Sequence, residues 1–313
     1  MNSDKIYLAA DSGGSKTIWS LISENGDEIS VCRTDGMASV RPGMIPVEET
    51  VRKASEMLGI VPSGIYLSLG GPNVDEIETA LESVWAGIPV IVEREATGNA
   101  VLYAAGFIGC KSVVMCGTGS VAVGDTKDGR KYSGGWGPAY GDGGSGGGLG
   151  SEALRIFLRS VDGFEDIGKV GELFSELTDG LDISEFSGRM KLKERAVNMS
   201  RRDLASLAPE IYTLAEQGDD VAQSLYSKAA EEIVLMANAV SDSGSVLLCG
   251  GFFKNKPKLL AEVGRLFYAV NGGTVNYNPN FSPIVAAKAA VLKNNGIEIN
   301  KEIFNRILED KLT

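Results

Sequence analysis

The chain has 313 residues, of which 43% are hydrophobic and 23% are charged, a composition typical of a soluble globular protein. It contains no histidine, which excludes catalytic triads, Cys-His dyads and metal sites that need imidazole. The formal net charge is −11, so we expect neither nucleic acid nor an anionic membrane as a partner. At about 100–200 residues per domain, the length predicts two domains.

The N-terminal segment and the cysteines indicate the compartment. The apolar run near the N-terminus is too short for a signal peptide, and no apolar stretch is long enough to span a membrane. The four cysteines form no Cys-x-x-Cys pair, which argues against zinc and dithiol redox sites. We therefore expect a cytoplasmic protein with reduced thiols.

Strands and helices alternate over the first third of the chain. Two apolar runs on either side of a glycine-rich turn predict strands at Ile6–Ala10 and Thr17–Ser23, and the turn Glu24-Asn25-Gly26-Asp27 has the composition of a hairpin. Apolar spacing then predicts, in chain order, strand Glu28–Arg33, helix Val47–Leu58, strand Ile65–Leu69, helix Val74–Trp85, strand Pro89–Val92 and helix Ala96–Phe107.

A second opening of strand, turn and strand follows at Ser112–Cys116 and Ser120–Gly124. The next segment, Gly134–Gly150, holds 10 glycines in 17 residues. The repeated opening predicts two related α/β halves. The remaining predicted elements are helices Ser151–Arg159, Ile167–Leu177, Arg202–Gln217 and Val221–Val240, strand Val246–Cys249, helix Lys256–Phe267, strand Thr274–Asn276, and helices Ile284–Asn294 and Lys301–Lys311.

The first glycine-rich turn has the composition of an anion site. It reads Asp11-Ser12-Gly13-Gly14-Ser15-Lys16-Thr17. Glycine lets backbone amides approach a phosphate closely, the polar side chains add donors, and a carboxylate at a strand end can hold magnesium through water. The spacing is not that of a Walker loop, and a strand follows rather than a helix. Taken alone, the segment is also typical of a plain hairpin.

Two further turns fit a nucleotide. Gly117-Thr118-Gly119-Ser120 repeats the arrangement in the second half, and the pair of turns indicates a polyphosphate site more strongly than either turn alone. Gly250-Gly251 follows an apolar strand and precedes a helix. Backbone lying against a flat ligand such as adenine needs glycine there, but so does a simple tight turn.

The segment from Gly134 to Gly146 reads Gly-Gly-Trp-Gly-Pro-Ala-Tyr-Gly-Asp-Gly-Gly-Ser-Gly. A flexible linker is the plain interpretation of so many glycines. The aromatic residues favour a different one, in which Trp136 helps to form a wall for a polar ring and Asp142 accepts hydrogen bonds from sugar hydroxyls.

Together these segments resemble the N-acetylglucosamine kinase group of the BadF/BadG/BcrA/BcrD ATPase family, within the actin/sugar-kinase/Hsp70 superfamily. The turn at 11–17 resembles the first phosphate motif, 117–120 matches the second, 134–145 resembles the segment characteristic of the group, and Gly250-Gly251 matches the adenosine motif. The resemblance implies an α/β, actin-like ATPase (ribonuclease H-like) fold with two lobes, each a mixed sheet flanked by helices. The implied lobes are residues 1–115 plus 291–313 and residues 116–290.

The resemblance implies an ATP-dependent sugar kinase that transfers a phosphoryl group from MgATP to a hydroxyl, first of all the 6-hydroxyl, of N-acetylglucosamine or a related amino sugar. ATP and sugar would share the cleft between the lobes, and a homodimer is common in the group. Asp11 would hold Mg²⁺ through water. The other implied ATP-binding residues are Gly13, Gly14, Ser15, Lys16, Thr17, Gly117, Thr118, Gly119, Ser120, Gly250, Gly251 and Asn255. The implied sugar-binding residues are Ser39, Gly134, Gly135, Trp136 and Asp142.

Two positions depart from the family pattern. The group usually has Val-Glu-Asn-Asp-Ala, in which the Asp is the catalytic base, whereas this chain has Val92-Glu93-Arg94-Glu95-Ala96. Glu95 therefore takes the place of the base with one additional methylene, and Glu93 is the second candidate. Glu95 at the start of a helix would also suit the helix dipole without any catalytic role. Gly143 replaces the usual Glu beside Asp142.

Three alternatives stay open at this point. One is an ATPase that activates a hydroxyacyl-CoA dehydratase, which would need exposed cysteines for an iron–sulfur cluster bridged between subunits. Another is a sugar-sensing pseudokinase, suggested by the changes at Glu95 and Gly143. The third is a kinase with a different acceptor, such as N-acetylmuramic acid, glucosamine or glucose.

Overall fold

The structure, a computed structural model, describes residues 5–13, 16–37, 46–69, 73–93, 98–137, 139–242 and 244–309. Its contacts divide the chain into two compact units: unit 1 is Met1–Lys111 with Asn278–Thr313, and unit 2 is Ser112–Tyr277. The lobes expected from the sequence, 1–115 plus 291–313 and 116–290, remain a prediction.

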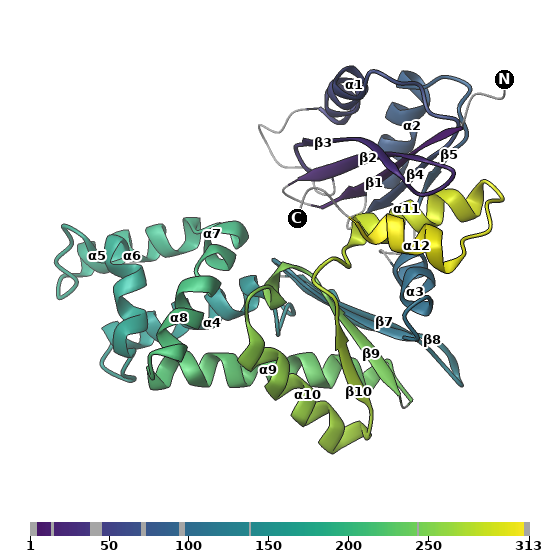
Figure 1. The fold of residues 1–313 in the computed structure, drawn as a ribbon. Helices are drawn as coiled ribbons and strands as arrows, with labels where there is room; N and C mark the ends of the chain where they lie inside the picture. The colour runs from purple at the N-terminus through teal and green to yellow at the C-terminus, as the bar shows by residue number, and fades with distance from the viewer. Residues whose placement is uncertain are drawn as a thin grey trace. The chain divides into compact units, whose positions relative to one another are not determined.

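Unit 1 contains a five-stranded mixed sheet in the order β3-β2-β1-β4-β5 (Figure 1). Strands β1 and β2 form the predicted hairpin, β2 and β3 pair antiparallel, and β1, β4 and β5 run parallel. The parallel strands therefore end at one edge of the sheet, where Asp11 and Glu93 lie. The strands are β1 (Ile6–Ser12), β2 (Thr17–Ser23), β3 (Glu28–Thr34), β4 (Ile65–Leu69) and β5 (Val90–Val92).

Helices cover both faces of this sheet. On one face, α1 (Val47–Leu58) and α2 (Val74–Val84) pack their apolar sides against alternate strand residues such as Leu8, Ala10 and Leu67. On the other face lie α3 (Gly98–Gly106) and α11 (Pro283–Asn294), and every residue from Ile284 to Leu292 is buried. Helix α12 (Lys301–Leu308) packs against α11.

Unit 2 repeats this topology. Its sheet has the order β10-β9-β6-β7-β8, with β6 antiparallel to β7, β7 antiparallel to β8, and β6, β9 and β10 parallel. The same order and directions in both sheets are what two related halves require. The strands are β6 (Ser112–Cys116), β7 (Ser120–Thr126), β8 (Gly129–Gly134), β9 (Ser245–Cys249) and β10 (Thr274–Tyr277).

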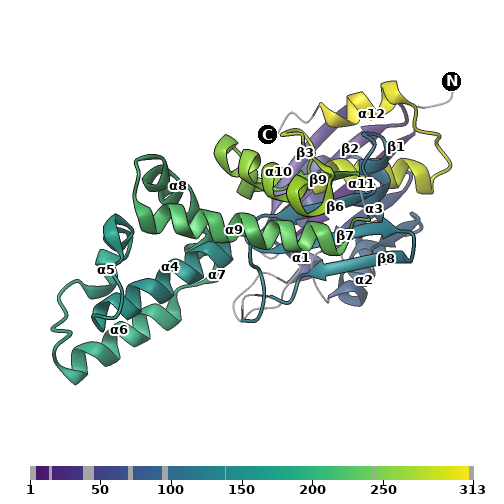
Figure 2. The same ribbon diagram turned by 90° about the horizontal axis from the view of Figure 1, so that it is seen from below.

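The helices of unit 2 share one large core with this sheet. They are α4 (Gly146–Val161), the 3-10 helix η1 (Gly168–Phe174), α5 (Ser175–Thr178), α6 (Phe186–Asn198), α7 (Arg201–Ser206), α8 (Ala208–Glu216), α9 (Asp220–Ala239), the 3-10 turn η2 (Gly251–Phe253) and α10 (Pro257–Asn271). Within unit 2, α5 and α6 lie at the end farthest from the sheet, and α9 runs from beside α8 to the sheet (Figure 2).

Three elements of unit 2 differ from the sequence-based expectation. The helix expected over 202–217 is divided at Leu207, because Pro209 in the first turn of α8 cannot donate a backbone hydrogen bond. The helix expected over 167–177 is a 3-10 helix followed by one α-helical turn. Helix α4 begins at Gly146, inside the glycine-rich segment, because Ser145 caps it by accepting from Gly148 N at 3.0 Å.

The described part of the chain has no helix that is both long enough and apolar enough to cross a membrane.

Candidate functional site

The first predicted phosphate turn lies in unit 1 between β1 and β2. Gly13 N donates to Lys16 O at 3.0 Å and closes the turn. The hydroxyls of Ser12 and Thr17 lie 2.9 Å apart, and that of Thr17 donates to Asp35 O at 3.0 Å. Thr17 is therefore fully buried and supports the hairpin, whereas Lys16 is exposed. Gly14 and Ser15 lie outside the described residues.

Asp11 stands at the carboxyl end of β1, beside this turn. Burial raises the pKa of its carboxyl to about 7, and nearby Lys16 opposes that rise only in part. In the unfolded chain an Asp titrates near pH 4 (about 3.9). Between these two pH values the unfolded state binds fewer protons than the folded state, so the ionisation of Asp11 lowers stability as pH rises from about 4 to about 7.

Asp11→Asn should therefore make the folded protein more stable at pH 8 than the wild type, because the amide cannot ionise. The advantage should be largest above pH 7 and should shrink toward pH 4, where the folded wild-type carboxyl is neutral and the unfolded one is only about half ionised. Thermal denaturation of both proteins at pH 4, 6 and 8 measures this. An equal difference in midpoint at all three pH values would contradict the burial of this charge.

The second predicted phosphate turn lies in unit 2 between β6 and β7, and the start of α4 holds it. Gly146 N donates to Gly117 O at 2.8 Å, Gly147 N donates to Thr118 O at 3.0 Å, and Ser145 Oγ donates to Thr118 O at 3.1 Å. The start of α4 thus binds the carbonyl oxygens of the turn, while the Thr118 side chain is exposed.

Glycine is required where α4 meets this turn. A Cβ atom at Gly147 would lie 2.4 Å from Thr118 O, and one at Gly148 would lie 2.2 Å from Asp142 O. The run of glycines that opens α4 is therefore a packing requirement of the turn, and it accounts for part of the glycine excess in this segment.

Asp142 links the turn to the glycine-rich segment. Its side chain is 3% exposed, its Oδ1 accepts from Ser120 N at 3.3 Å, and its Oδ2 forms an ion pair with Arg201 at the start of α7. Asp142 has a left-handed backbone with φ of 65°, and its own carbonyl accepts from Ser145 Oγ at 2.6 Å. Each carboxylate oxygen has lone pairs left for a further donor.

The other predicted residues of unit 2 lie at the same sheet edge or beside it. Gly135 N donates to Ser120 O at 2.8 Å, so Gly134 and Gly135 adjoin the turn. Gly250 follows β9 with φ of 108°, and a Cβ there would meet Cys116 O at 2.2 Å. Gly251 and Asn255 are exposed, and so is Trp136, at 78%. The structure thus brings 117–120, 134–135, 142 and 250 together within unit 2.

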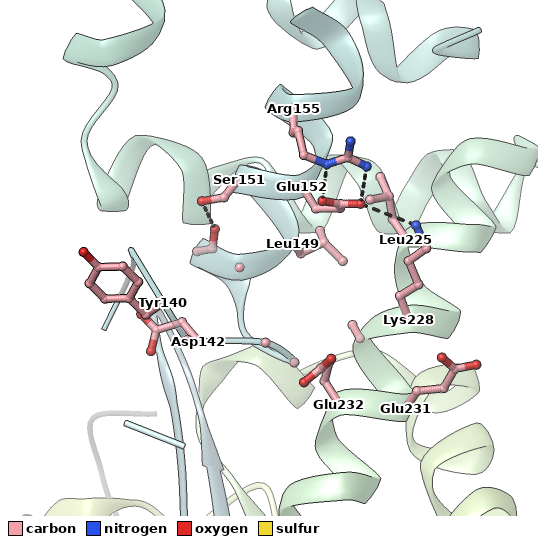
Figure 3. Close-up of a pocket in the computed structure, with 16 residues that line it drawn as sticks. Tyr140, Asp142, Leu149, Ser151, Glu152, Arg155, Leu225, Lys228, Glu231 and Glu232 are labelled. Carbon is pink, nitrogen blue, oxygen red and sulfur yellow. Dashed lines mark hydrogen bonds and ion pairs between the residues drawn. The ribbon is translucent and has the colours of Figure 1, made fainter. Parts of the chain in front are cut away.

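Unit 2 also contains a cavity of about 550 Å³ beside Asp142 (Figure 3). Its floor is the backbone of glycines between 141 and 148, and α4 and α9 form its walls. On the wall, Glu152 pairs with Arg155 and with Lys228 at 2.8 and 3.4 Å. Glu232 reaches from α9 toward the backbone, where its Oε2 would lie 2.7 Å from a Cβ at Gly143. Because Gly143 has no side chain, the Glu232 carboxylate can occupy the space beside it.

Two predicted residues of unit 1, Glu95 and Ser39, lie outside the described residues. Glu93, two positions before Glu95, is among the described residues. It is 6% exposed, and its Oε1 accepts from Asn99 N at 2.8 Å and from Ala100 N at 3.4 Å, at the start of α3. It also contacts Tyr66, whose pKa is raised by burial and then by this carboxylate.

The residues present fit a nucleotide with magnesium. The described residues contain no cluster of three or more Asp, Glu, Cys or His side chains that could hold a metal ion by itself. Mg²⁺ bound with a nucleotide needs only one or two carboxylates, since phosphates and water supply the remaining ligands. The Asp11 carboxyl forms no hydrogen bond or ion pair with another described residue, and burial raises its pKa, so a cation beside it would favour its charged form.

Sequence reasoning missed two residues that contact the candidate site, Arg201 and Ser145. Arg201 is 59 residues from Asp142 in the chain and belongs to no motif, so no local signal could have identified it. Ser145 gave a weak signal, since serine is favoured before a helix, but the glycines after it argue against a helix at that point.

All four cysteines are free and buried. For Cys116, burial followed by the nearby Cys249 and Asp142 raises the pKa well above the usual range, so the thiol is protonated at neutral pH. An iron–sulfur cluster bridged between subunits needs exposed thiols, and these are not available at any of the four positions.

Comparison with known proteins defines the class. The family model of the BadF/BadG/BcrA/BcrD ATPase family matches residues 10–292, and the chain belongs to this family. It is 24% identical over 268 residues to an N-acetyl-D-glucosamine kinase of Dictyostelium discoideum, covering 76% of this chain and 80% of that protein. It is 28% identical over 218 residues to an N-acetylmuramic acid/N-acetylglucosamine kinase of Clostridium acetobutylicum, covering 67% and 66%.

Solved structures show the same fold. A candidate N-acetylglucosamine kinase from Chromobacterium violaceum matches with a TM-score of 0.68 at 21% identity, over 92% of this chain and 99% of that chain. A ROK family glucokinase from Streptomyces griseus matches with a TM-score of 0.56 at 14% identity, over 92% and 99%. The predicted family and the predicted actin-like ATPase fold, with a mixed sheet flanked by helices in each half, are confirmed.

Proposed function

We propose that the chain is an ATP-dependent sugar kinase that phosphorylates a hydroxyl, first of all the 6-hydroxyl, of N-acetylglucosamine or a related amino sugar. The observation that carries this proposal is the network in unit 2 in which Asp142 binds the amide of Ser120 in the phosphate turn. A carboxylate of the predicted sugar segment is thereby fixed to the turn predicted to hold phosphate. The names of both curated relatives support the same acceptor class.

In this proposal the backbone amides and side chains of 13–17 and 117–120 bind the nucleotide's phosphates, and the Gly250-Gly251 turn with Asn255 lies against adenosine. Asp11 holds the hydrated magnesium ion, which when bound neutralises charge on the phosphates. Phosphoryl transfer needs mainly alignment and charge stabilisation, which such turns supply.

Ser39, the backbone of Gly134 and Gly135, Trp136 and Asp142 bind the sugar in this proposal. Glu95 takes the proton of the acceptor hydroxyl. The oxygen of that hydroxyl bonds to the γ-phosphorus while the bond between the γ-phosphorus and the leaving ADP breaks. Glu93 is the weaker candidate for the base, because its carboxylate is buried and already accepts from the amides of α3.

A coupled assay of ADP release tests the acceptor class. We expect ATP- and magnesium-dependent ADP release with N-acetylglucosamine, and a lower kcat/KM with glucose than with N-acetylated amino sugars. The panel should include N-acetylmuramic acid, glucosamine and buffer alone. Sugar binding by calorimetry without ADP release for any member of the panel would identify a sugar-sensing pseudokinase instead.

We also propose a homodimer, which follows from the family resemblance, and a cytoplasmic location, which follows from the cysteine pattern. Light scattering of the purified protein tests the first, since a monomer mass at micromolar concentration would contradict it.

A further inference from the structure

Three polar side chains form a row across the carboxyl edge of the sheet in unit 1. Asp11 on β1 pairs in register with Ser68 on β4. Glu93 directly follows β5, and its amide donates to Leu67 O at 2.8 Å, which places it beside Ser68. Neighbouring strands lie about 4.8 Å apart, so each member of the row is next to the one before it.

All three side chains lie on the same face of the sheet. Side chains alternate between the two faces along a strand, and the preceding residues Ala10, Leu67 and Val92 all belong to the core under α1 and α2. Asp11, Ser68 and Glu93 therefore point to the opposite face, the one that α3 and α11 cover.

Ser68 is the unexplained member of this row. It is fully buried, and its Oγ has no hydrogen-bond partner in the described part of the chain. A buried hydroxyl without a partner costs about 1–3 kcal/mol, so such a group calls for an explanation. By contrast, the equally buried Ser20 of the same sheet donates to Glu28 Oε2 at 3.0 Å.

The hydroxyl of Ser68 lies between two acidic residues. On one side is Glu93, whose Oε1 accepts from two amides of α3 and whose carboxylate interacts with Tyr66. Asp11, on the other side, forms no side-chain hydrogen bond or ion pair with another described residue. A serine hydroxyl changes direction by rotation about one bond, and Asp11 occupies the adjacent register position on the same face of the sheet.

We propose that Ser68 is a positioning residue that donates a hydrogen bond to Asp11 when that carboxylate holds the magnesium ion of the nucleotide. The bond fixes one carboxylate oxygen and leaves the other oxygen for water on the ion. Without the ion the hydroxyl has no partner among the described residues, so the cost of burying it falls on the protein without nucleotide and is removed when the nucleotide and its ion bind. This inference rests on the proposed function.

The test compares Ser68→Ala with Ser20→Ala as the matched control. Magnesium dependence is read without turnover, as the Mg²⁺ concentration that half-saturates ADP binding in calorimetry, and stability is read as the thermal midpoint without ligand. We expect Ser68→Ala to raise the half-saturating Mg²⁺ concentration about tenfold with an equal or higher thermal midpoint. Ser20→Ala should lower the midpoint and leave the Mg²⁺ dependence unchanged.

A second background separates positioning from general damage. In Asp11→Asn protein, Ser68→Ala should cause no further loss of Mg²⁺-dependent ADP binding, because the residue through which it acts is already changed. Normal Mg²⁺ dependence in Ser68→Ala would overturn the inference alone. A wild-type protein whose ADP binding does not depend on Mg²⁺ would overturn the magnesium role in the proposed function, and the inference with it.

Discussion

Glu95→Gln should lower the turnover number for sugar phosphorylation by about 10²- to 10⁴-fold, the usual contribution of a positioned general base. The amide cannot accept the proton of the acceptor hydroxyl, whereas its size and hydrogen-bonding capacity stay close to those of the carboxylate. The KM values for ATP and sugar should change much less than kcat. Steady-state kinetics with N-acetylglucosamine measures both.

Glu82→Gln is the control for this substitution, because Glu82 is an exposed residue of α2 and should retain wild-type turnover. If Glu95→Gln also retained it, Glu95 would not be the base. Glu93→Gln should in that case be assayed next, since Glu93 is the other acidic residue of the 92–96 run.

Lys288→Met should destabilise the protein by about 3–5 kcal/mol, because it leaves an unpaired charge in the interior. Lys288 of α11 and Glu28 of β3 are 1% and 5% exposed, and their Nζ and Oε2 atoms lie 2.6 Å apart. Ser20 donates to the same carboxylate oxygen, so the lone glutamate would retain only a hydroxyl partner. Urea denaturation at neutral pH measures the loss.

The double variant Glu28→Gln/Lys288→Met provides the comparison. It removes both charges while the glutamine oxygen can still accept from Ser20, so most of the lost stability should return. A double variant as unstable as Lys288→Met alone would show that lost packing of the lysine side chain, and not the unpaired charge, causes the effect.

The sequence predicted most elements of the sheets because their signals are local. The strands of both β-turn-β openings are short runs rich in apolar residues, which is a local signal. The hairpin turn contains Gly26, whose φ of 83° favours glycine. Helix α6 was missed because it presents only Gly188, Leu192 and Ala196 to the core. Strand β8 was missed because it lies within a polar, glycine-containing run that is exposed along most of its length.

The residues of the candidate site also differ in whether local sequence signals could identify them. The two predicted phosphate turns and Asp142 could be proposed from motifs, since each depends on residues within a few positions of one another. Arg201 and Ser68 could not, because their importance follows from contacts between distant segments or from a missing contact. Only the register of β1 with β4 shows that Ser68 stands beside Asp11.

The most direct test of the account is to incubate the protein with ATP whose γ-phosphate is labelled with ³²P, together with Mg²⁺ and N-acetylglucosamine, and to identify the labelled product. We predict that label moves to the sugar as a 6-phosphate ester, in step with ADP formation. Label found only as inorganic phosphate, at a rate that added sugar does not change, would contradict the proposal that this chain is a sugar kinase.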